Sequence, residues 1–356
     1  MLFALRASDG QVRWKDPGPA APTLADGTLY AIVSSAAVAY ALSATDGTTR
    51  WNVTFPGYFN TVGSDDPPLL ARGLLYIAVS GHDCAPNGWV YGLRASDGAV
   101  VWRTPFERAV LPTRALTGGA LLLASSTYPA SDEQDFLTAL RPADGARLWR
   151  ILLDITPYYI AAQDGIIVVS GYFYGDKFEA RRASDGQRLW ITPANRYNLA
   201  PPVVANGLVY VSGQDGDLYA LRLQDGAVQW RFDAGTGTDT GLSVSSVPAV
   251  VGNTIYWGAG PLLYALDAST GVLRHFYHLF SDKEDGGPGE YLYFYSPATV
   301  ADGALFVAAR VTPACNLPHC GQESATLYAI EIATGAELWQ HSESEGLPTL
   351  PAVVGP

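Results

Sequence analysis

Alternating apolar and polar residues, with a period of two, run along almost the whole chain. Segments such as DLYALRLQ (217–224) and PPVVANGLVYVSG (201–213) follow this pattern and are rich in β-branched and aromatic residues. Most such segments are separated by an Asn-Gly, Asp-Gly or Thr-Gly pair, which permits the tight turn of a hairpin. No segment shows the period of an amphipathic helix. The pattern therefore predicts an all-β chain built from hairpins.

A motif whose commonest form is Ala-x-Arg-x-x-Asp-Gly-x-x-x-Trp occurs eight times. The copies lie at 4–14, 41–51, 92–102, 139–149, 180–190, 220–230, 265–275 and 329–339. Their turn glycines are between 37 residues apart (Gly10 to Gly47) and 64 residues apart (Gly271 to Gly335). This is the length of a four-stranded propeller blade with variable loops. We predict one domain over residues 1–356, an eight-bladed β-propeller of four-stranded antiparallel blades, with a linear solenoid as the alternative.

Within a unit we name the strands A to D, with the motif spanning strands C and D. The chain begins in strand C of one unit (LFALRAS), and LPAVVGP (350–356) matches the start of VPAVVGNTIYWG (247–258), which is strand A. Strands A, C and D of the closing blade are thus accounted for, and strand B is missing. We expect an incomplete closing blade, and interpret the sequence as a piece of a longer reading frame.

The third and sixth motif positions vary together. Where the third residue is Arg or Ser, as at Arg94, the sixth residue is Asp, as at Asp97. Where the third residue is acidic, as at Asp267, the sixth residue is Thr, as at Thr270. Two carboxylates never occupy both positions, and like charges at close range are destabilising. We predict that these two side chains are in contact and form a structural clasp at the turn.

A tryptophan ends seven of the eight motif copies, and His275 takes its place in the seventh copy. We predict that these tryptophans stack between neighbouring blades as structural docking residues, because a large flat side chain occurs once per unit. They are Trp14, Trp51, Trp102, Trp149, Trp190, Trp230 and Trp339.

The motif resembles the tryptophan-docking motif, Ala-x-Asp-x-x-Thr-Gly-x-x-x-Trp, of β-propellers related to pyrroloquinoline quinone (PQQ) enzymes. The resemblance covers essentially the whole chain, although most copies carry Arg and Asp where the family motif has Asp and Thr. The family contains eight-bladed PQQ-dependent alcohol dehydrogenases and non-catalytic propellers such as BamB and sensor ectodomains. The resemblance alone implies an extracytoplasmic location, in the periplasm, cell envelope or outside the cell.

A dehydrogenase of this family would hold PQQ on a Ca²⁺ ion beside a disulfide between adjacent cysteines. This chain has no adjacent cysteines, and no Glu, Asn or Asp matches the Ca²⁺ ligands by local motif. Trp89 and Trp257 are the only tryptophans outside the repeat, and neither has the context of a quinone site. We therefore expect no catalytic residue, no metal and no cofactor, with a PQQ- and Ca²⁺-dependent alcohol or sugar dehydrogenase as the alternative.

Nearly every insertion falls between strands B and C or between blades, which antiparallel alternation places on one face of the disc. Function concentrates on loops carried by a rigid scaffold, so we predict that this face binds the ligand. Packing of the loops is the alternative role for its aromatic residues. The candidate binding residues are Tyr58, Tyr172, Phe173, Tyr174, Tyr291, Tyr293 and Tyr295.

Two cysteines in CNLPHC, Cys315 and Cys320, form a possible disulfide that would staple a loop. Free thiols are one alternative. A zinc site that adds His319 with His82 and Cys84 is another, although half of any common zinc pattern is absent.

The net charge of −12 argues against a nucleic-acid partner, since phosphate binding needs a basic surface. No run of apolar residues is long enough to span a membrane. The sequence thus favours a monomeric, non-catalytic binding platform that recognises a protein partner or an extended ligand. A ligand-sensing ectodomain is a third possibility.

Overall fold

The computed structural model of the chain describes most residues of the repeated units. The described residues are 2–16, 22–33, 36–56, 67–80, 88–106, 109–126, 135–171, 177–193, 201–213, 215–235, 246–259, 262–278, 290–294, 298–313 and 324–343. All regular structure within them is β, and they include no helix with the length and apolar character needed to cross a membrane.

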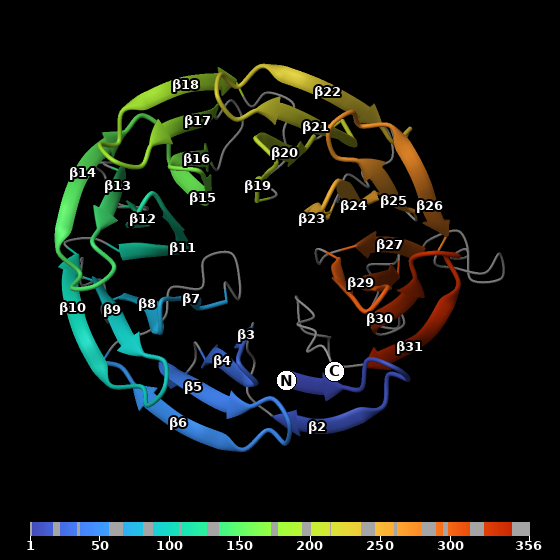
Figure 1. Cartoon of the computed structure of the whole chain (residues 1–356), viewed down its shortest axis with the longest axis horizontal. Helices are drawn as coiled ribbons and strands as arrows, with labels where there is room; N and C mark the ends of the chain where they lie inside the picture. The colour runs from blue at the N-terminus through green and yellow to red at the C-terminus, as the bar shows by residue number, and fades with distance from the viewer. Residues whose placement is uncertain are drawn as a thin grey trace.

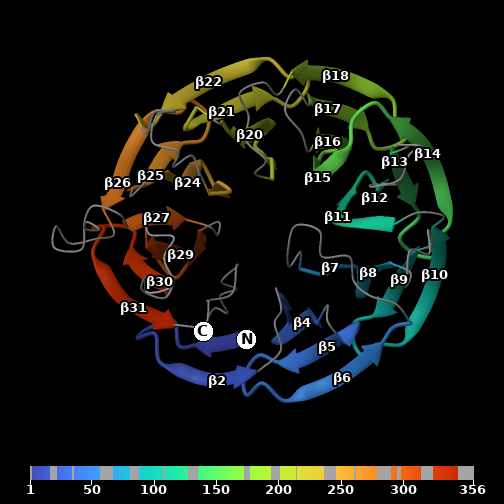
Figure 2. The same cartoon turned by 180° about the vertical axis from the view of Figure 1, so that it is seen from behind.

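Seven antiparallel blades stand radially in a ring (Figure 1), and Figure 2 shows the same ring from behind. Strand A of each blade lies nearest the centre and strand D forms the outer rim. The inner strands A are β3 (Thr23–Ala25), β7 (Leu69–Ala71), β11 (Ala109–Thr117), β15 (Pro157–Gln163), β19 (Val203–Ala205), β23 (Ala249–Val251) and β28 (Thr299–Ala301). Strands B are β4 (Thr28–Val33), β8 (Leu74–Ser80), β12 (Ala120–Ser126), β16 (Ile166–Gly171), β20 (Leu208–Ser212), β24 (Thr254–Ala259) and β29 (Ala304–Pro313).

The repeated motif forms strands C and D, as predicted. Strands C are β5 (Val38–Ser43), β9 (Gly88–Arg94), β13 (Asp135–Leu140), β17 (Lys177–Arg182), β21 (Asp217–Arg222), β25 (Leu262–Asp267) and β30 (Ser324–Glu331). Strands D are β6 (Thr49–Thr54), β10 (Val100–Phe106), β14 (Arg147–Leu153), β18 (Arg188–Pro193), β22 (Val228–Asp233), β26 (Leu273–His278) and β31 (Glu337–Glu343). A fifth strand, β27 (Glu290–Phe294), joins the seventh blade.

The prediction of eight blades is wrong: the described residues form seven. The first motif copy makes only a two-stranded sheet of β1 (Leu2–Leu5) and β2 (Val12–Asp16), which lies between β31 and the first blade (Figure 1). The motif marks only a C–D hairpin, and among the described residues this copy has no A or B strand beside that hairpin, so it does not count as a blade. Residues 350–356, predicted as strand A of the closing blade, lie outside the described residues.

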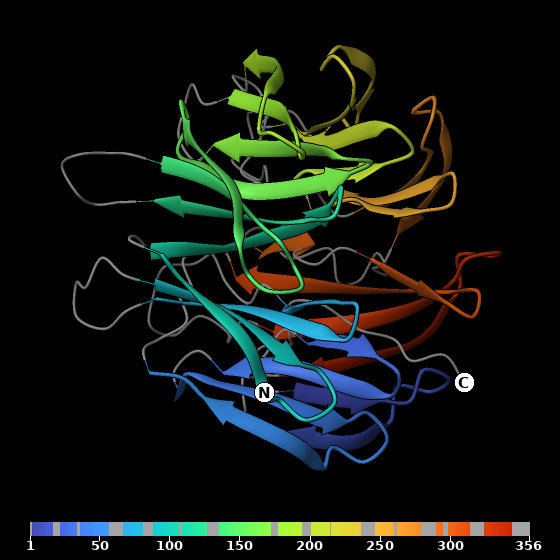
Figure 3. The same ribbon diagram turned by 60° about the vertical axis from the view of Figure 1, so that its left-hand side comes forward.

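The tight turns follow from local sequence. At the A–B turn of the fifth blade both central residues, Asn206 and Gly207, have positive φ (55° and 74°). This is the geometry of a type I′ hairpin turn, which favours Asn-Gly and Asp-Gly pairs. Seen from the side, the strands run across the thickness of the disc (Figure 3).

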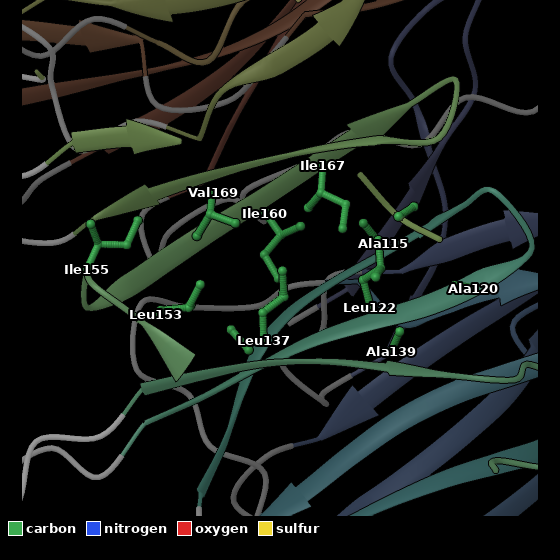
Figure 4. Packing of buried hydrophobic residues seen from close by; sticks show 12 residues of the cluster. Ala115, Ala120, Leu122, Leu137, Ala139, Leu153, Ile155, Ile160, Ile167 and Val169 are labelled. Carbon is green, nitrogen blue, oxygen red and sulfur yellow. The ribbon is translucent and has the colours of Figure 1, made fainter. Parts of the chain in front are cut away.

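The core consists of separate apolar layers between successive blades. The layer between the third and fourth blades is composed of small and branched aliphatic residues, among them Leu122, Leu137, Ile160 and Val169 (Figure 4). Ile167 and Leu137 are completely buried. Because each blade buries both faces against neighbours, the fold is stabilised by repeated contacts between adjacent blades.

The seven motif tryptophans lie at the joints between these layers. Each indole N–H donates to the carbonyl at the fourth motif position of the following blade or hairpin, with donor–acceptor distances of 2.7 to 3.1 Å. The pairs are Trp14–Ala44, Trp51–Ala95, Trp102–Pro142, Trp149–Ala183, Trp190–Leu223, Trp230–Ala268 and Trp339–Ala7. The last pair joins the final described blade to the first motif copy, and so links the two ends of the ring.

The seventh motif copy uses a different donor at its joint. His275 stands in place of tryptophan, and the hydroxyl of Tyr277 donates to the Ile332 carbonyl at 3.3 Å. The rings of His275 and Tyr277 both approach Gly335, where a Cβ would lie 3.1 Å from the histidine Nε2. In this copy His275 and Tyr277 together pack on the turn glycine and supply the hydrogen bond, whereas one indole does both in the other copies.

The predicted clasp is present in seven of the eight motif copies. Arg94 donates to Asp97 at 2.8 Å, and the matching Arg–Asp pairs follow in four further copies. Asp267 accepts from Thr270 at 2.9 Å, and Glu331 accepts from Thr334 at 2.5 Å. In the remaining copy Asp46 accepts from the amide and the hydroxyl of Thr48, at 3.1 and 2.8 Å. The sixth residue also accepts a backbone amide two residues later, as Asp97 does from Ala99 at 3.0 Å, so the clasp fixes the turn.

Substitution of a docking tryptophan tests the joint. Trp230→Ala is expected to lower the free energy of unfolding by about 3–5 kcal/mol, because a buried ring is lost between two blades. Trp230→Phe is expected to cost less, since it retains part of the ring. Denaturant titration followed by circular dichroism measures both. Val228→Ala, on the same strand but 51% exposed, is the control; a Trp230→Ala effect no larger than the control contradicts the assignment.

Low pH should lower the free energy of unfolding, because it protonates the aspartates of the clasps. Backbone amides and motif arginines hold the pKa of Asp97, Asp144 and Asp185 below the usual 3.8. Since these pKa values are lowered by folding, the stabilisation is complete above pH 3.8 and is lost as pH falls through the lower folded values. Denaturation midpoints measured from pH 7 to pH 2 should fall only in the acid range. Unchanged midpoints at the acid end would contradict the prediction, and Asp97→Asn should reduce the acid dependence.

Candidate functional site

Topology separates the disc into two faces of different character. The A–B and C–D turns lie on one face, here called the turn face, and the B–C and inter-blade connections lie on the other, the loop face. The turn face is made of short described turns such as 206–207 and 225–226. The described strands that flank the longer insertions end at the loop face, which is the face that the sequence predicted for binding.

Most of the predicted aromatic binding residues lie outside the described residues. These are Tyr58, Tyr172, Phe173, Tyr174 and Tyr295. Cys84, Cys315 and Cys320 also lie outside them, together with His82 and His319, so the disulfide and the zinc alternative stay predictions. Only Tyr291 and Tyr293 fall on a described backbone.

Tyr291 and Tyr293 belong to β27, the additional strand of the seventh blade. β27 pairs with the later half of β29, with Tyr291 opposite Thr312 and Tyr293 opposite Arg310. The earlier half of the same β29 edge pairs with β28. The inner edge of this blade is therefore extended toward the loop face, and the two predicted tyrosines stand on regular strand backbone.

The third and fourth blades also have long inner strands, a feature that the sequence analysis missed. β11 and β15 contain nine and seven residues, where the five other inner strands A contain three. Tyr158 and Tyr159 lie at the loop-face end of β15 with ring centroids 4.5 Å apart in an edge-to-face arrangement. The sequence PYYIAAQ carried the signal, since two tyrosines precede an apolar run.

A polar cluster in the fifth blade was also not predicted. Asp217 starts β21 and is 1% exposed, and it forms an ion pair with Arg231 of β22. The hydroxyl of Tyr219 donates to Asp215 at 2.5 Å. The Arg231 guanidinium lies 5.6 Å from the centroid of the Tyr219 ring. The cluster thus joins strands C and D near the loop face, and the sequence DGD at 215–217 was its only signal.

The charged and hydroxyl groups of this cluster influence one another's protonation. Burial raises the pKa of the Asp217 carboxyl, and the Arg231 guanidinium partly offsets this. Burial and the hydrogen bond to Asp215 raise the pKa of the Tyr219 hydroxyl, so it stays protonated near neutral pH. Every member has a partner inside the cluster. Arg231 remains 46% exposed, and it therefore presents a positioned cation on a protein of net charge −12.

The fourth blade carries a buried ion pair on the side that packs against the third blade. Glu179 is fully buried and accepts from Arg181 Nε at 2.6 Å, and Arg181 also donates to the Gly186 carbonyl at 3.0 Å. The other motif copies have Leu or Ile in the place of Arg181. The two charges compensate each other in an otherwise apolar layer, so we assign the pair to blade packing.

Potential metal ligands and the two tryptophans outside the repeat can be located in the described part of the chain. Within those residues no three His, Cys, Asp or Glu side chains gather as a metal would require. Trp257 is completely buried between the fifth and sixth blades, and its indole donates to Ser212 Oγ at 3.1 Å. Trp89 lies under the Arg103 guanidinium at 4.7 Å. Both indoles are thus used in packing.

The sequence of this chain matches a known protein family. The sequence profile described as "Outer membrane protein assembly factor BamB" matches residues 1–120 and 133–293. Outer membrane protein assembly factor BamB of Yersinia pestis is 26% identical over 214 residues, which cover 56% of this chain and 53% of that protein. The chain therefore spans about half the length of this curated relative.

Solved structures agree on the fold. BamB from Moraxella catarrhalis aligns with a TM-score of 0.58 at 16% identity, covering 86% of this chain and 87% of that chain. Quinohemoprotein alcohol dehydrogenase from Comamonas testosteroni aligns with a TM-score of 0.62 at 12% identity, covering 95% and 68%. At these identities the likeness shows the fold alone. Since the profile match covers well over half of the sequence, this chain belongs to the BamB family of PQQ-like β-propellers.

Proposed function

We propose that this protein is a non-catalytic binding platform that works outside the cytoplasm and recognises a protein partner through its loop face. The observation that carries the proposal is the match of residues 1–120 and 133–293 to the BamB family. The BamB relatives are assembly factors for outer membrane proteins by name, and assembly factors act by binding other proteins.

The architecture supports this role physically. Indole donors and glycine contacts hold each blade to the next, so the disc presents its loops from a rigid base. A rigid base limits the conformational entropy that binding costs. Tyrosine side chains lose little freedom when they are ordered, and they contribute large contact areas, which suits Tyr291 and Tyr293 on β27.

A partly exposed arginine also supports binding of a protein partner. The protein is strongly acidic, yet Arg231 stays half-exposed beside Tyr219 in the fifth blade. Arginine and tyrosine, together with tryptophan, are enriched among interface hot spots. We therefore include Arg231 with the loop-face tyrosines as a candidate contact for the partner.

Site-specific photo-cross-linking tests the proposed face. A photoreactive phenylalanine analogue replaces Tyr291 or Tyr293 in cells that produce the protein, and Gln187, which is exposed on a C–D turn, is the matched position on the turn face. We expect one discrete protein adduct from the loop-face positions and none from Gln187. Equal adducts from both faces, or none from either, would contradict the proposal.

The partner captured in this way allows a quantitative test. Arg231→Ala is expected to weaken its binding about tenfold, the loss of a moderate hot spot. Arg150→Ala is the matched control, because Arg150 follows the docking tryptophan of the third blade as Arg231 follows that of the fifth. Calorimetry with purified proteins measures both. Equal affinities for the two variants would remove Arg231 from the interface.

The alternative function, a PQQ- and Ca²⁺-dependent dehydrogenase, predicts a different result. Titration of the folded protein with PQQ in the presence of Ca²⁺ should give no stoichiometric heat if the protein is a platform. Circular dichroism of the same sample establishes that it is folded. Tight one-to-one binding would favour the dehydrogenase and call for a screen of alcohols and sugars with an artificial electron acceptor.

A further inference from the structure

The large apolar residues that stay exposed in the described structure lie mostly on the outer rim of the disc. Most of them belong to strands D. The strands β10, β14 and β18 follow one another along the rim (Figure 1) and carry six of them. An exposed apolar patch of this kind marks a binding surface in many soluble proteins. The six residues are Val100, Val101, Leu148, Leu152, Leu189 and Ile191.

The same three rim strands are basic, although the whole protein has a net charge of −12. They contain no Asp or Glu, and their basic residues are Arg103, Arg147, Arg150 and Arg188. Arg188 pairs with Asp154. The guanidinium of Arg103 lies 4.7 Å from the centroid of the Trp89 ring, and that of Arg150 lies 3.7 Å from the Phe136 ring. Cation–π contacts thus hold two cations between the exposed apolar residues of the rim.

The main-chain groups of β14 alternate between β13 and the outer edge of the blade. The amide of Arg141 donates to the Ala146 carbonyl at 2.7 Å, so this residue of strand C faces strand D. Every second residue of a strand directs its N–H and C=O to the same side. With the observed register, Trp149 therefore bonds to β13, and the N–H and C=O groups of Arg150 and Leu152 point away from the sheet.

Prolines in the two neighbouring rim strands support this orientation. Pro105 of β10 and Pro193 of β18 occupy the motif position of Leu152, and both strands stay paired with strand C there. Since proline has no N–H, the amide at this position is not needed inside the blade. A proline also protects an exposed edge against pairing with another strand. β14 has no such protection, because it carries both outward donors.

The side chains of β14 determine which strand fits its edge. Leu148, Arg150 and Leu152 are alternate residues, and the leucines are 45% and 53% exposed in the folded chain. In the register that pairs Leu148 with Leu152 of a second copy, Arg150 would face its own counterpart, and like charges opposite each other are destabilising. A carboxylate opposite Arg150 is favourable instead. Arginine has five N–H donors, so a guanidinium stacked on a ring can still bind a carboxylate.

We propose that the outer edge of β14 binds an extended segment of a partner protein with the pattern apolar-x-(Asp/Glu)-x-apolar. The segment adds to the third blade as an antiparallel strand and exchanges main-chain hydrogen bonds with Arg150 and Leu152. Its carboxylate pairs with Arg150, and its apolar side chains cover Leu148 and Leu152. The surface is the rim of the disc and not the loop face, so the inference does not depend on the proposed function.

A pair of short peptides tests the edge. TLTETLT places glutamate opposite Arg150 and leucines opposite Leu148 and Leu152, and TLTKTLT has lysine in place of the glutamate. We expect TLTETLT to bind the whole protein saturably in fluorescence anisotropy, and TLTKTLT to bind about tenfold more weakly, because it puts like charges opposite each other. Binding of TLTETLT should also slow hydrogen exchange at the amides of Arg150 and Leu152, which exchange rapidly in the free protein.

Three protein variants separate strand pairing from general adhesion. Arg150→Glu should reverse the preference, so that TLTKTLT binds more tightly than TLTETLT. Arg103→Glu is the matched control, because Arg103 has the same motif position and the same ring contact on β10, where Pro105 protects the edge. It should leave the preference unchanged. Leu152→Pro introduces the proline of the neighbouring blades, so the fold is retained, and binding of TLTETLT should fall about tenfold.

Several results would overturn the proposal. One is no binding of TLTETLT to protein that circular dichroism shows to be folded, and another is equal binding of the two peptides. Slow exchange at Arg150 and Leu152 in the free protein would mean that the edge is already covered. Dimerisation that Leu152→Pro abolishes would assign the edge to a second copy. Sedimentation with phosphatidylglycerol vesicles that Arg150→Glu abolishes, without peptide binding, would assign it to a lipid surface.

Discussion

The hydrogen bond from a motif indole to the carbonyl of the next blade is the interaction on which the ring depends. Each blade is a separate sheet, and in the described residues side-chain packing and side-chain hydrogen bonds hold it against its neighbours. The indole of Trp230 packs on Gly271 of the next blade, where an added Cβ would stand 2.6 Å from the ring. The same indole donates to the carbonyl of Ala268, which also belongs to that next blade. Shape and polarity therefore both specify how one blade meets the next. At the joint of the seventh motif copy, the hydroxyl of Tyr277 supplies the donor. The joint therefore requires an aromatic ring that carries a hydrogen-bond donor, and this ring need not be tryptophan.

The clasp at the C–D turn prepares the surface that each indole meets. A carboxylate or hydroxyl at the sixth motif position accepts the amide two residues later and bonds to the third position, as in Asp97 with Ala99 and Arg94. This holds the turn glycine where the ring of the preceding blade can stack on it. The same geometry is reached with Arg and Asp or with Asp and Thr, because both pairs provide one donor and one acceptor. The motif is thus a device of the fold, and it carries no information about a reaction.

The residues that pack blade against blade are different from those that the blades leave exposed. The apolar layers, the buried Glu179–Arg181 pair and the buried Trp257 all serve packing between blades. The polar cluster around Arg231 has internal partners for its acidic groups, and it leaves a fixed cation half-exposed. In the described residues, the acidic members of this cluster are thus satisfied within the blade, and the Arg231 guanidinium is the member that reaches solvent.

The sequence by itself determined the class of fold, the strand pairs of each unit, the docking positions and the clasp. These follow from local periodicity and from eight internal copies, which report the same environment repeatedly. The sequence predicted eight blades with an incomplete closing blade, whereas the described residues form seven blades and the two-stranded sheet of β1 and β2, because a motif copy marks a C–D hairpin and not a complete blade. The sequence also did not reveal the Asp217–Arg231 cluster or the buried Glu179–Arg181 pair, whose members occur once and have no repeat to mark them. Tertiary structure decided those features, since charge compensation depends on which side chains the folded blades bring together.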